Sequence, residues 1–342
     1  MSDLKKLGEF GLIERFRSRL TTRSPKVKVG IGDDCAVYAS GSGNYQVVTT
    51  DALIESVHFD LSITSAKQLG RKALSVNISD IAAMGGVPTL ALVTLGIPKK
   101  FPVKFLDGFY DGLNQICRKY KIELSGGDTV ASPGKLFISI TLLGEAKKGR
   151  LFLRQGARPG DRILVTGSLG ESALGLKLLT AKRKKWSGSA RDKKKLIRAH
   201  LDPIPRVAES TLLGRSRVRI RGMIDISDGL IQDLRHVCKA GGVGALINEK
   251  SLPRSPALIR VCSINQLNPL DFILGGGEDY ELLFTLKAED VKKILRQFQN
   301  ARTAVTVIGE IIPASGKLVL EKTDGRLEVL AKSLGFNHFQ PK

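Results

Sequence analysis

The sequence predicts an α/β protein (of the α+β type) that is divided into two domains. At 342 residues the chain is long enough for two hydrophobic cores, and its 36 glycines suit many tight turns. Strand-like and helix-like apolar spacing alternates in both halves. A polar stretch at 145–150 separates the halves, so we place one domain at 1–147 and the other at 148–342.

The first half is predicted to begin with an amphipathic helix that carries Phe10, Ile13 and Phe16 on one face. Further helices are predicted at 65–84 and 105–116, and strands at 46–50, 89–95, 122–124 and 136–143. The 46–50 strand is expected to end at Asp51. Asn77 and Asp80 are three residues apart on the 65–84 helix and share a face, which we interpret as a buried ligand face.

The second half shows the same alternation. Strands are predicted at 162–166, 220–226, 245–248, 281–285 and 305–311, and helices at 172–179 and 288–298. Another helix is expected to begin at Asp228-Gly229-Leu230. The acid- and glycine-containing stretches of this half therefore lie near predicted strand ends, as they do in the first half.

The charge is strongly basic, with 54 Lys and Arg against 33 Asp and Glu, a net charge of +21. Much of the excess lies at 15–28 and in a basic insert, Lys182–Lys195. Aromatic residues make up 6 % of the chain and are not interleaved with the basic runs, as a surface that stacks nucleic-acid bases requires. We therefore interpret the insert as a solvated helix–loop region and expect no specific nucleic-acid partner. A polyanion-binding protein stays the alternative from another functional class.

Cysteine and histidine spacing does not indicate a zinc site. The four cysteines show no CxxC pair, and the four histidines are scattered. We expect buried, reduced thiols. No apolar run approaches the roughly 20 residues of a membrane helix, so we expect a cytoplasmic protein without a membrane partner.

Carboxylates beside Gly, Ser or Thr recur six times. The stretches are Gly32-Asp33-Asp34, Thr49-Thr50-Asp51, Asn77-Ile78-Ser79-Asp80, Gly126-Gly127-Asp128-Thr129, Asp225-Ile226-Ser227-Asp228-Gly229 and Gly276-Gly277-Glu278-Asp279-Tyr280. Two acids about 4 Å apart repel by on the order of 4 kcal/mol at an effective dielectric near 20, so a cation, a basic side chain or a shared proton must offset them. Six such stretches favour a shared site for hard cations. Oxygen ligands without histidine or cysteine suit Mg²⁺.

The usual phosphate-binding loops are missing. The chain has no GxxxxGK[ST], no kinase-type glycine loop and no Val-Ala-Ile-Lys strand. An ATP-dependent enzyme without these motifs must hold the triphosphate mostly through metal ions, which agrees with the excess of aspartates.

Together and in this order, the six stretches resemble the thiamine-monophosphate kinase family, within the aminoimidazole ribonucleotide synthetase-like ATP-binding superfamily. The resemblance runs from Gly8-Glu9-Phe10 to Gly335-Phe336-Asn337-His338-Phe339. It implies a two-domain fold whose N-terminal sheet is used for dimerisation, followed by a C-terminal α/β domain. The reactive cysteines of the hydrogenase-maturation and selenophosphate branches are absent. Another ATP-dependent synthetase of the superfamily stays the second alternative.

The resemblance implies ATP-dependent phosphorylation of thiamine monophosphate to thiamine diphosphate by direct transfer, in a homodimer. Asp51, Asp128 and Asp225 are the implied catalytic residues. The implied ligands of several Mg²⁺ ions are Asp34, Thr49, Thr50, Asp51, Asp80, Asp128, Asp225 and Asp228. Implied ATP contacts are Tyr110, Gly127, Asp128, Arg154 and Ser227, and implied substrate contacts are His58, Glu278 and Phe336.

Overall fold

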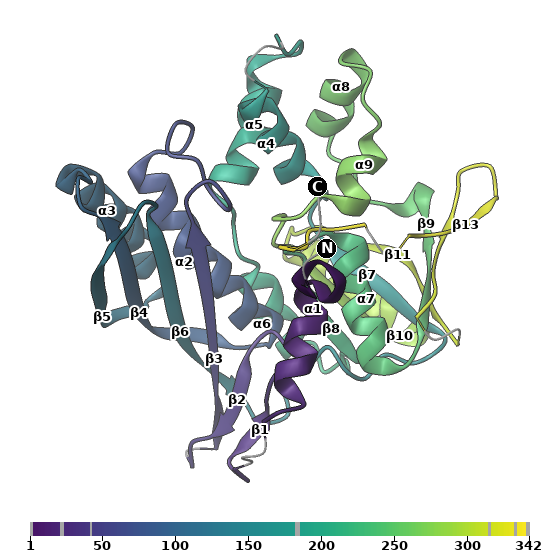
Figure 1. The fold of residues 1–342 in the computed structure, drawn as a ribbon. Helices are drawn as coiled ribbons and strands as arrows, with labels where there is room; N and C mark the ends of the chain where they lie inside the picture. The colour runs from purple at the N-terminus through teal and green to yellow at the C-terminus, as the bar shows by residue number, and fades with distance from the viewer. Residues whose placement is uncertain are drawn as a thin grey trace.

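The structure is a computed structural model, and it describes residues 3–20, 24–41, 43–181, 185–313, 316–331 and 334–339. These residues form two β-sheets with helices between and around them (Figure 1). Among them, no helix combines the length and the apolar character needed to cross a membrane. The four cysteines are buried and unpaired, as expected.

The first sheet has six strands. Their spatial order is β1 (Val27–Val29), β2 (Ala36–Ala39), β3 (Asn44–Ile54), β6 (Phe137–Lys147), β4 (Val87–Pro98) and β5 (Glu123–Ser132). Neighbouring strands are antiparallel except β4 and β5, which are parallel. β5 is the last strand in this order and so forms an edge of the sheet. The helix α3 (Val103–Tyr120) connects β4 to β5.

The inner face of this sheet packs on the helix α2 (Ala66–Ala83), and α3 packs on α2. Two glycines bring the helices together. A Cβ on Gly70 would lie 2.0 Å from the carbonyl oxygen of Phe109, and one on Gly112 would lie 2.2 Å from that of Lys67. The outer face of the sheet carries exposed apolar side chains, among them Leu92.

The second sheet has seven strands and belongs to the C-terminal half. Their spatial order is β13 (Leu327–Val329), β12 (Leu318–Glu321), β9 (Gly244–Asn248), β11 (Val305–Ile312), β7 (Asp161–Thr166), β10 (Leu282–Lys287) and β8 (Gly222–Asp225). One core cluster contains side chains of α4 (Glu171–Thr180), α5 (Ala190–Leu201), α7 (Leu230–Gly241), α8 (Pro256–Ile264) and α9 (Pro269–Gly275). A separate cluster contains side chains of α6 (Val207–Arg215) and α10 (Val291–Asn300).

α2 joins the two halves. It contacts β3 and β6 of the first sheet, and also β8 and α6 of the second half. The Ser79 hydroxyl donates to the carboxylate of Asp225 at 2.6 Å, and the Ser210 hydroxyl donates to the carbonyl of Ala82 at 2.6 Å. Because almost every residue from 69 to 83 is buried, α2 is a core helix rather than a surface helix.

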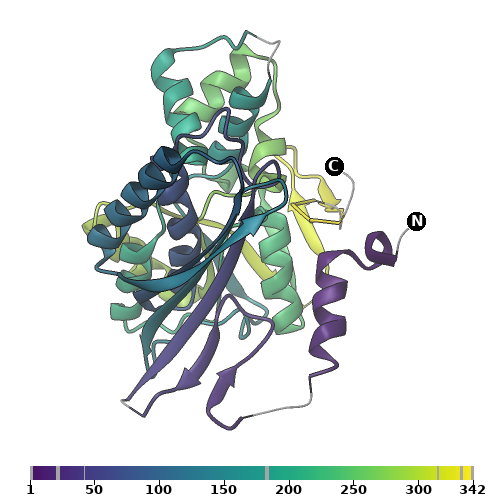
Figure 2. The ribbon, with the colours of Figure 1, turned by 60° about the vertical axis from the view of Figure 1, so that its left-hand side comes forward.

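The two ends of the described chain lie together (Figure 2). The opening helix α1 (Asp3–Arg17), interrupted at Gly8, lies beside the C-terminal segment. The Glu9 backbone N–H donates to the Asn337 side chain at 3.3 Å. The Phe10 ring lies 4.5 Å from the ring of His236 on α7. α1 thus packs against the second half, although it precedes the first sheet.

Two stretches expected at strand ends lie inside strands instead. β3 pairs with β6 without interruption from Asn44 to Ile54, so Asp51 lies within the ladder. Gly126, Gly127 and Asp128 pair with β4 within β5. Continuous backbone hydrogen bonding explains both differences, because a polar side chain does not end a strand whose neighbours continue.

The basic insert is described in part. Lys182, Arg183 and Lys184 lie outside the described residues, and α5 contains Lys193, Lys194 and Lys195. β6 ends at Lys147 and β7 begins at Asp161, so the boundary proposed at 147/148 falls at the start of the connection between the sheets. This boundary stays a prediction.

Candidate active site

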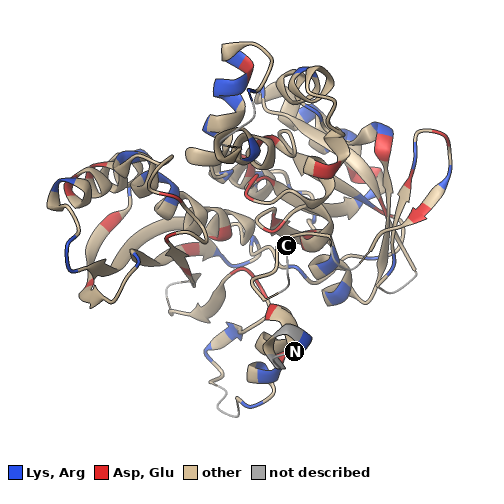
Figure 3. Cartoon of the chain, turned by 45° about the horizontal axis from the view of Figure 1, so that its top comes forward, with Lys and Arg blue, Asp and Glu red and all other residues tan. Residues whose placement is uncertain are grey.

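Three carboxylates from distant parts of the chain meet where the two halves join. Asp34 lies in the loop before β2, Asp80 on α2 and Asp225 at the end of β8. Each offers a carboxylate oxygen within 4.8 Å of the others. In the view of Figure 3, several acidic residues lie where the two halves meet, and Lys and Arg are spread over helices, strands and loops.

Two residues of β3 extend this acidic cluster. The Thr49 hydroxyl donates to an oxygen of Asp80 at 2.5 Å. The backbone N–H of Asp51 donates to the Asn77 side chain at 3.2 Å. Asn77 and Asp80 therefore face β3 together, as their spacing predicts. They form a buried polar face of α2.

The raised pKa values of the carboxyl groups in this cluster show that the protein itself does little to offset their negative charges. Burial, and then the repulsion of neighbouring acids, raises the pKa of Asp51 to about 6 and that of Asp80 well above its usual value. Burial and the nearby Asp34 raise the pKa of Asp225 to about 8. A bound cation would offset this repulsion and release the protons.

Asp34 gives the most specific indication of a cation site. Its Oδ1 accepts a hydrogen bond from Nε of Arg154 at 3.0 Å. Its Oδ2 is buried and has no hydrogen-bond partner among the described residues. The backbone N–H of Arg154 is turned to Asp33, at 3.2 Å. An orphaned carboxylate oxygen among oxygen donors fits Mg²⁺ well and fits a soft metal poorly.

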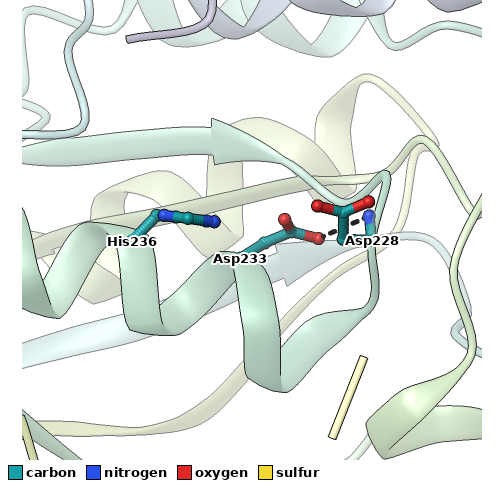
Figure 4. Close-up of side chains that lie close together, drawn as sticks. All are labelled: Asp228, Asp233 and His236. Atoms are coloured by element: carbon teal, nitrogen blue, oxygen red, sulfur yellow. Dashed lines mark hydrogen bonds between the residues drawn. The ribbon is translucent and has the colours of Figure 1, made fainter. Parts of the chain in front are cut away.

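A second group of ligand atoms lies at the start of α7 (Figure 4). Asp228, Asp233 and His236 offer atoms within 4.8 Å of one another. Oδ2 of Asp233 accepts the backbone N–H groups of Asp228 at 3.1 Å and of Gly229 at 3.0 Å, and so fixes the turn that presents Asp228. Burial, and then Arg154, lowers the pKa of His236 to about 3, so its ring is neutral.

Sequence reasoning missed Asp233 and His236. The available signal was an Asp-x-x-His pair on a helix that follows an acid–glycine turn, because residues three apart on a helix share a face. It also missed Asp33 as the acceptor that holds the Arg154 backbone.

The three residues expected to contact the substrate lie near one another. The ring of His58 is 5.0 Å from that of His338, which is 4.9 Å from that of Phe336. The charge of Glu278 is close enough to act on the pKa of His58, which burial lowers overall. His338, which links the two aromatic positions, was not singled out from the sequence.

Glu278 is held firmly. Its backbone is in the left-handed region at φ 63°, which costs on the order of 1 kcal/mol for a non-glycine residue. Its N–H donates to the carbonyl of Ser227 at 2.7 Å. Its carboxylate is paired with Lys72 at 2.8 Å and with His200 at 3.0 Å. Burial alone would raise the pKa of Glu278, but these two partners outweigh burial and lower it to about 2.

Asp128 and Thr50 lie apart from the acidic cluster. Ala52, Ser139, Thr94 and Asp128 are paired in one row across β3, β6, β4 and β5, so they share the outer face of the sheet. Asp128 is exposed and, among the described residues, its carboxylate hydrogen-bonds only to the N–H of Thr129, at 2.8 Å. Thr50 also points outward and accepts a hydrogen bond from Thr141 at 3.3 Å.

The remaining expected ATP contacts lie on different elements. Gly127 cannot carry a side chain, because a Cβ there would lie 1.7 Å from the Val93 carbonyl oxygen. Tyr110 lies on α3, with its ring 5.7 Å from that of Phe109. Ser227 follows β8 between the metal-site candidates Asp225 and Asp228.

Two known family models match the two halves of the chain. The family model of the AIR synthase related protein N-terminal domain matches residues 32–146, and that of the C-terminal domain matches residues 158–321. Thiamine-monophosphate kinase of Bacillus subtilis (strain 168) is 36 % identical over 334 residues, which cover 98 % of this chain and 100 % of the relative. This chain belongs to the thiamine-monophosphate kinase family.

Solved structures of the thiamine-monophosphate kinase family share the fold. One, described as AaThiL complexed with AMPPCP and TMP, superposes with a TM-score of 0.84 at 35 % identity and covers 99 % of both chains. The kinase from Aquifex aeolicus superposes with a TM-score of 0.77 at 33 % identity, over 95 % of this chain and 99 % of that one. The expected two-domain aminoimidazole ribonucleotide synthetase-like fold is therefore confirmed.

Proposed function

We propose that this protein is a thiamine-phosphate kinase that transfers the γ-phosphoryl group of ATP to thiamine monophosphate. The observation that carries the proposal is the junction of the two halves. There, the acidic cluster with the orphaned oxygen of Asp34 lies in the same fold as a separate group formed by His58, Glu278 and Phe336. The name of the relatives and the complex of one of them with AMPPCP and TMP support it.

The chemistry suits a site without a strong general base. A terminal phosphate oxygen of thiamine monophosphate forms the new bond to the γ-phosphorus, and the bond from that phosphorus to the β–γ bridging oxygen breaks. ADP and thiamine diphosphate leave. Because the attacking oxygen is already anionic near neutral pH, positioning and charge compensation account for most of the rate enhancement.

The residues of the acidic cluster fit Mg²⁺. Asp34, Thr49, Asp51, Asp80 and Asp225 would hold it. Asp228 belongs to the second group, and it is near enough for the charge of Asp51 to raise its pKa. The ions would neutralise charge on the phosphates during transfer. Arg154 hydrogen-bonds to Asp33 through its backbone N–H and to Asp34 through its side chain. Together with Ser227, Gly127 and Tyr110, it stays a predicted ATP contact.

The aromatic group suits the other end of the acceptor. Thiamine is a cationic aromatic molecule, and stacking it on a ring such as Phe336 contributes roughly 0.5–2 kcal/mol. The ionised carboxylate of Glu278 accepts hydrogen bonds from N–H donors. Lys72, which pairs with Glu278, and Asp80 lie eight residues apart on α2, about 12 Å along its axis, so the recognition and transfer ends are separated by roughly the length of an extended small molecule.

We further propose a homodimer in which the partner supplies Asp128. Within one subunit Asp128 lies on the outer face of the sheet, three strands or about 14 Å from β3. Exposed Tyr38, Ile54, Leu92 and Val130 make that face suitable for a second copy of the same sheet. A copy packed there would bring its edge strand towards the first subunit's Thr50. A cytoplasmic location stays a prediction.

The decisive test is to incubate purified protein with ATP, Mg²⁺ and thiamine monophosphate and to follow ADP and thiamine diphosphate by chromatography. We expect both products in equal amounts and none with excess EDTA. Asp51→Asn should lower turnover by about 1000-fold or more while keeping the wild-type fold. Asp111→Asn, an exposed acid on α3, is the matched control and should retain full activity.

Other outcomes distinguish the alternatives. ADP without thiamine diphosphate would point to another ATP-dependent reaction of this superfamily. No nucleotide turnover, together with salt-sensitive RNA binding, would favour the polyanion-binding alternative. Full turnover by Asp51→Asn would remove this residue from the metal site.

A further inference from the structure

Lys72 is a buried cation that the proposed transfer chemistry leaves without a role. It lies on α2 with its side chain 2 % exposed, and its ammonium group is 2.8 Å from Oε1 of Glu278. A charged group is retained in such a place only when it is paired, because water no longer solvates it. The partner comes from the other half of the molecule, so this ion pair crosses the domain junction.

His200, from α5, holds the second oxygen of the same carboxylate. Its Nδ1 lies 3.0 Å from Oε2 of Glu278, and its side chain is 6 % exposed. Ser172 lies 3.2 Å from the same nitrogen. Burial, and then Lys72, lowers the pKa of His200, so the ring is neutral and donates from Nδ1 to the carboxylate.

The arrangement leaves one side of Glu278 open. Each carboxylate oxygen has two lone pairs, and Lys72 and His200 use one on each. The side chain of Glu278 is 27 % exposed, far more than either partner. Two buried donors therefore lie behind the carboxylate, and its remaining lone pairs are available from the exposed side, in the neighbourhood of His58.

We propose that Lys72 and His200 are positioning residues that hold Glu278 ionised and in one orientation, so that it accepts hydrogen bonds from an N–H donor on the phosphate acceptor. The inference rests on the proposed function of this site and deepens it. The acceptor must carry a phosphate, which receives the transferred phosphoryl group at the acidic cluster. It must also carry an N–H group that lies near Glu278. Acceptors that lack this group, or that carry a carbonyl in its place, are excluded because the carboxylate cannot donate.

The proposal predicts a pH signature. The groups acting on Glu278 are Lys72 from α2, His200 from α5, and His58 from the loop after β3, with Tyr280 nearby on its own segment. With both partners present, the pKa of Glu278 is about 2, and the group is ionised at every working pH. Without Lys72, burial is no longer offset, so the pKa rises and protonation weakens acceptor binding as the pH falls.

The test is the steady-state kinetics of Lys72→Met between pH 6 and pH 8. We expect KM for thiamine monophosphate to rise about tenfold at pH 8 and further at pH 6, with kcat and KM for ATP changed by less than about threefold. Lys67→Met is the matched control, because Lys67 lies on the same helix in an exposed pair with Asp111. It should behave as the wild type does.

Each result decides between the two proposals. If the wild type does not phosphorylate thiamine monophosphate, the proposed function fails. If the wild type is active and Lys72→Met retains its KM and its pH profile, the positioning role is wrong.

A second variant covers the case in which Lys72→Met does not fold, because it leaves the partly buried carboxylate of Glu278 without its cation. Lys72→Met/Glu278→Gln removes both charges at once. We expect this protein to fold and to keep a KM about tenfold above the wild-type value, now independent of pH between 6 and 8. A wild-type KM for this double variant would overturn the proposal.

Discussion

Asp34 is the side chain whose hydrogen bonds best fit a cation ligand. Arg154 satisfies one of its oxygens, and the other is buried without a hydrogen bond. A native protein rarely leaves a buried oxygen unsatisfied, because desolvation costs about 1–3 kcal/mol or more for a charged group. Together with the raised pKa values of Asp80 and Asp225, this supports the proposed cation site.

At this scale we predict that Asp225→Asn stabilises the protein in EDTA, increasingly so as the pH rises. Burial, and then Asp34, raises the pKa of Asp225 to about 8, so the folded state keeps a proton that the unfolded state loses near pH 4. The stabilising contribution of that proton is full below about pH 4 and is lost progressively as the pH rises from there to about 8. Asparagine does not titrate.

The measurement is urea denaturation at pH 5 to 8. We expect the unfolding free energy of Asp225→Asn relative to wild type to increase by roughly 1 kcal/mol per pH unit. Asp111→Asn should show no such trend. A constant difference across this range would show that Asp225 titrates at its usual pH.

α2 is the element on which the site depends. It carries Asp80 towards the acidic cluster, Ser79 towards Asp225 and Lys72 towards Glu278. Its position is set by contact with α3, where Gly70 leaves no room for a side chain. Because the helix is buried on several sides, it cannot shift without moving the side chains of the candidate site in both halves.

We predict that Gly70→Ala destabilises the protein by about 3 kcal/mol, since the new Cβ would lie 2.0 Å from the backbone oxygen of Phe109. Displacement of α2 should also lower kcat, because Asp80 moves with it. Thermal unfolding and the kinase assay measure the two effects. Gly134→Ala is the control, because a Cβ there meets nothing within 4 Å. Equal stability of the two variants would contradict the close α2–α3 contact.

At the scale of the whole molecule, one arrangement would explain both the exposed outer face of the first sheet and the exposed position of Asp128 on it: a second subunit packed against that face. An edge strand with exposed polar and apolar groups is commonly covered in an assembly. If Asp128 acts in the site of the partner, the isolated subunit is incomplete. The two faces of one sheet then serve different purposes: the inner face packs on α2, and the outer face forms the dimer.

Mixing two inactive variants tests this arrangement. Asp51→Asn and Asp128→Asn subunits, refolded together in equal amounts, should recover about a quarter of wild-type activity. Random pairing makes half of the dimers mixed, and one of the two sites in each mixed dimer is intact. If both residues act within one subunit, every site carries a defect and no activity returns.

What the sequence determined by itself is local and chemical. The spacing of Asn77 and Asp80 predicts a shared helix face, the oxygen-rich donor set predicts a hard cation, and the order of six motifs identifies the family. Each depends on residue type and short-range geometry, which the chain specifies directly. Short elements such as β1, β2, β12 and β13 were not predicted, because three or four residues carry too little periodic signal.

Tertiary structure decided which of these residues meet. Strand register, and not the motif, places Asp51 on the inner face and Asp128 on the outer face. Packing of α2 against α5 and the loop before β10 pairs Lys72 and His200 with Glu278. Contacts between residues far apart in the chain depend on the whole fold, because a local pattern does not specify which distant surface will pack against it.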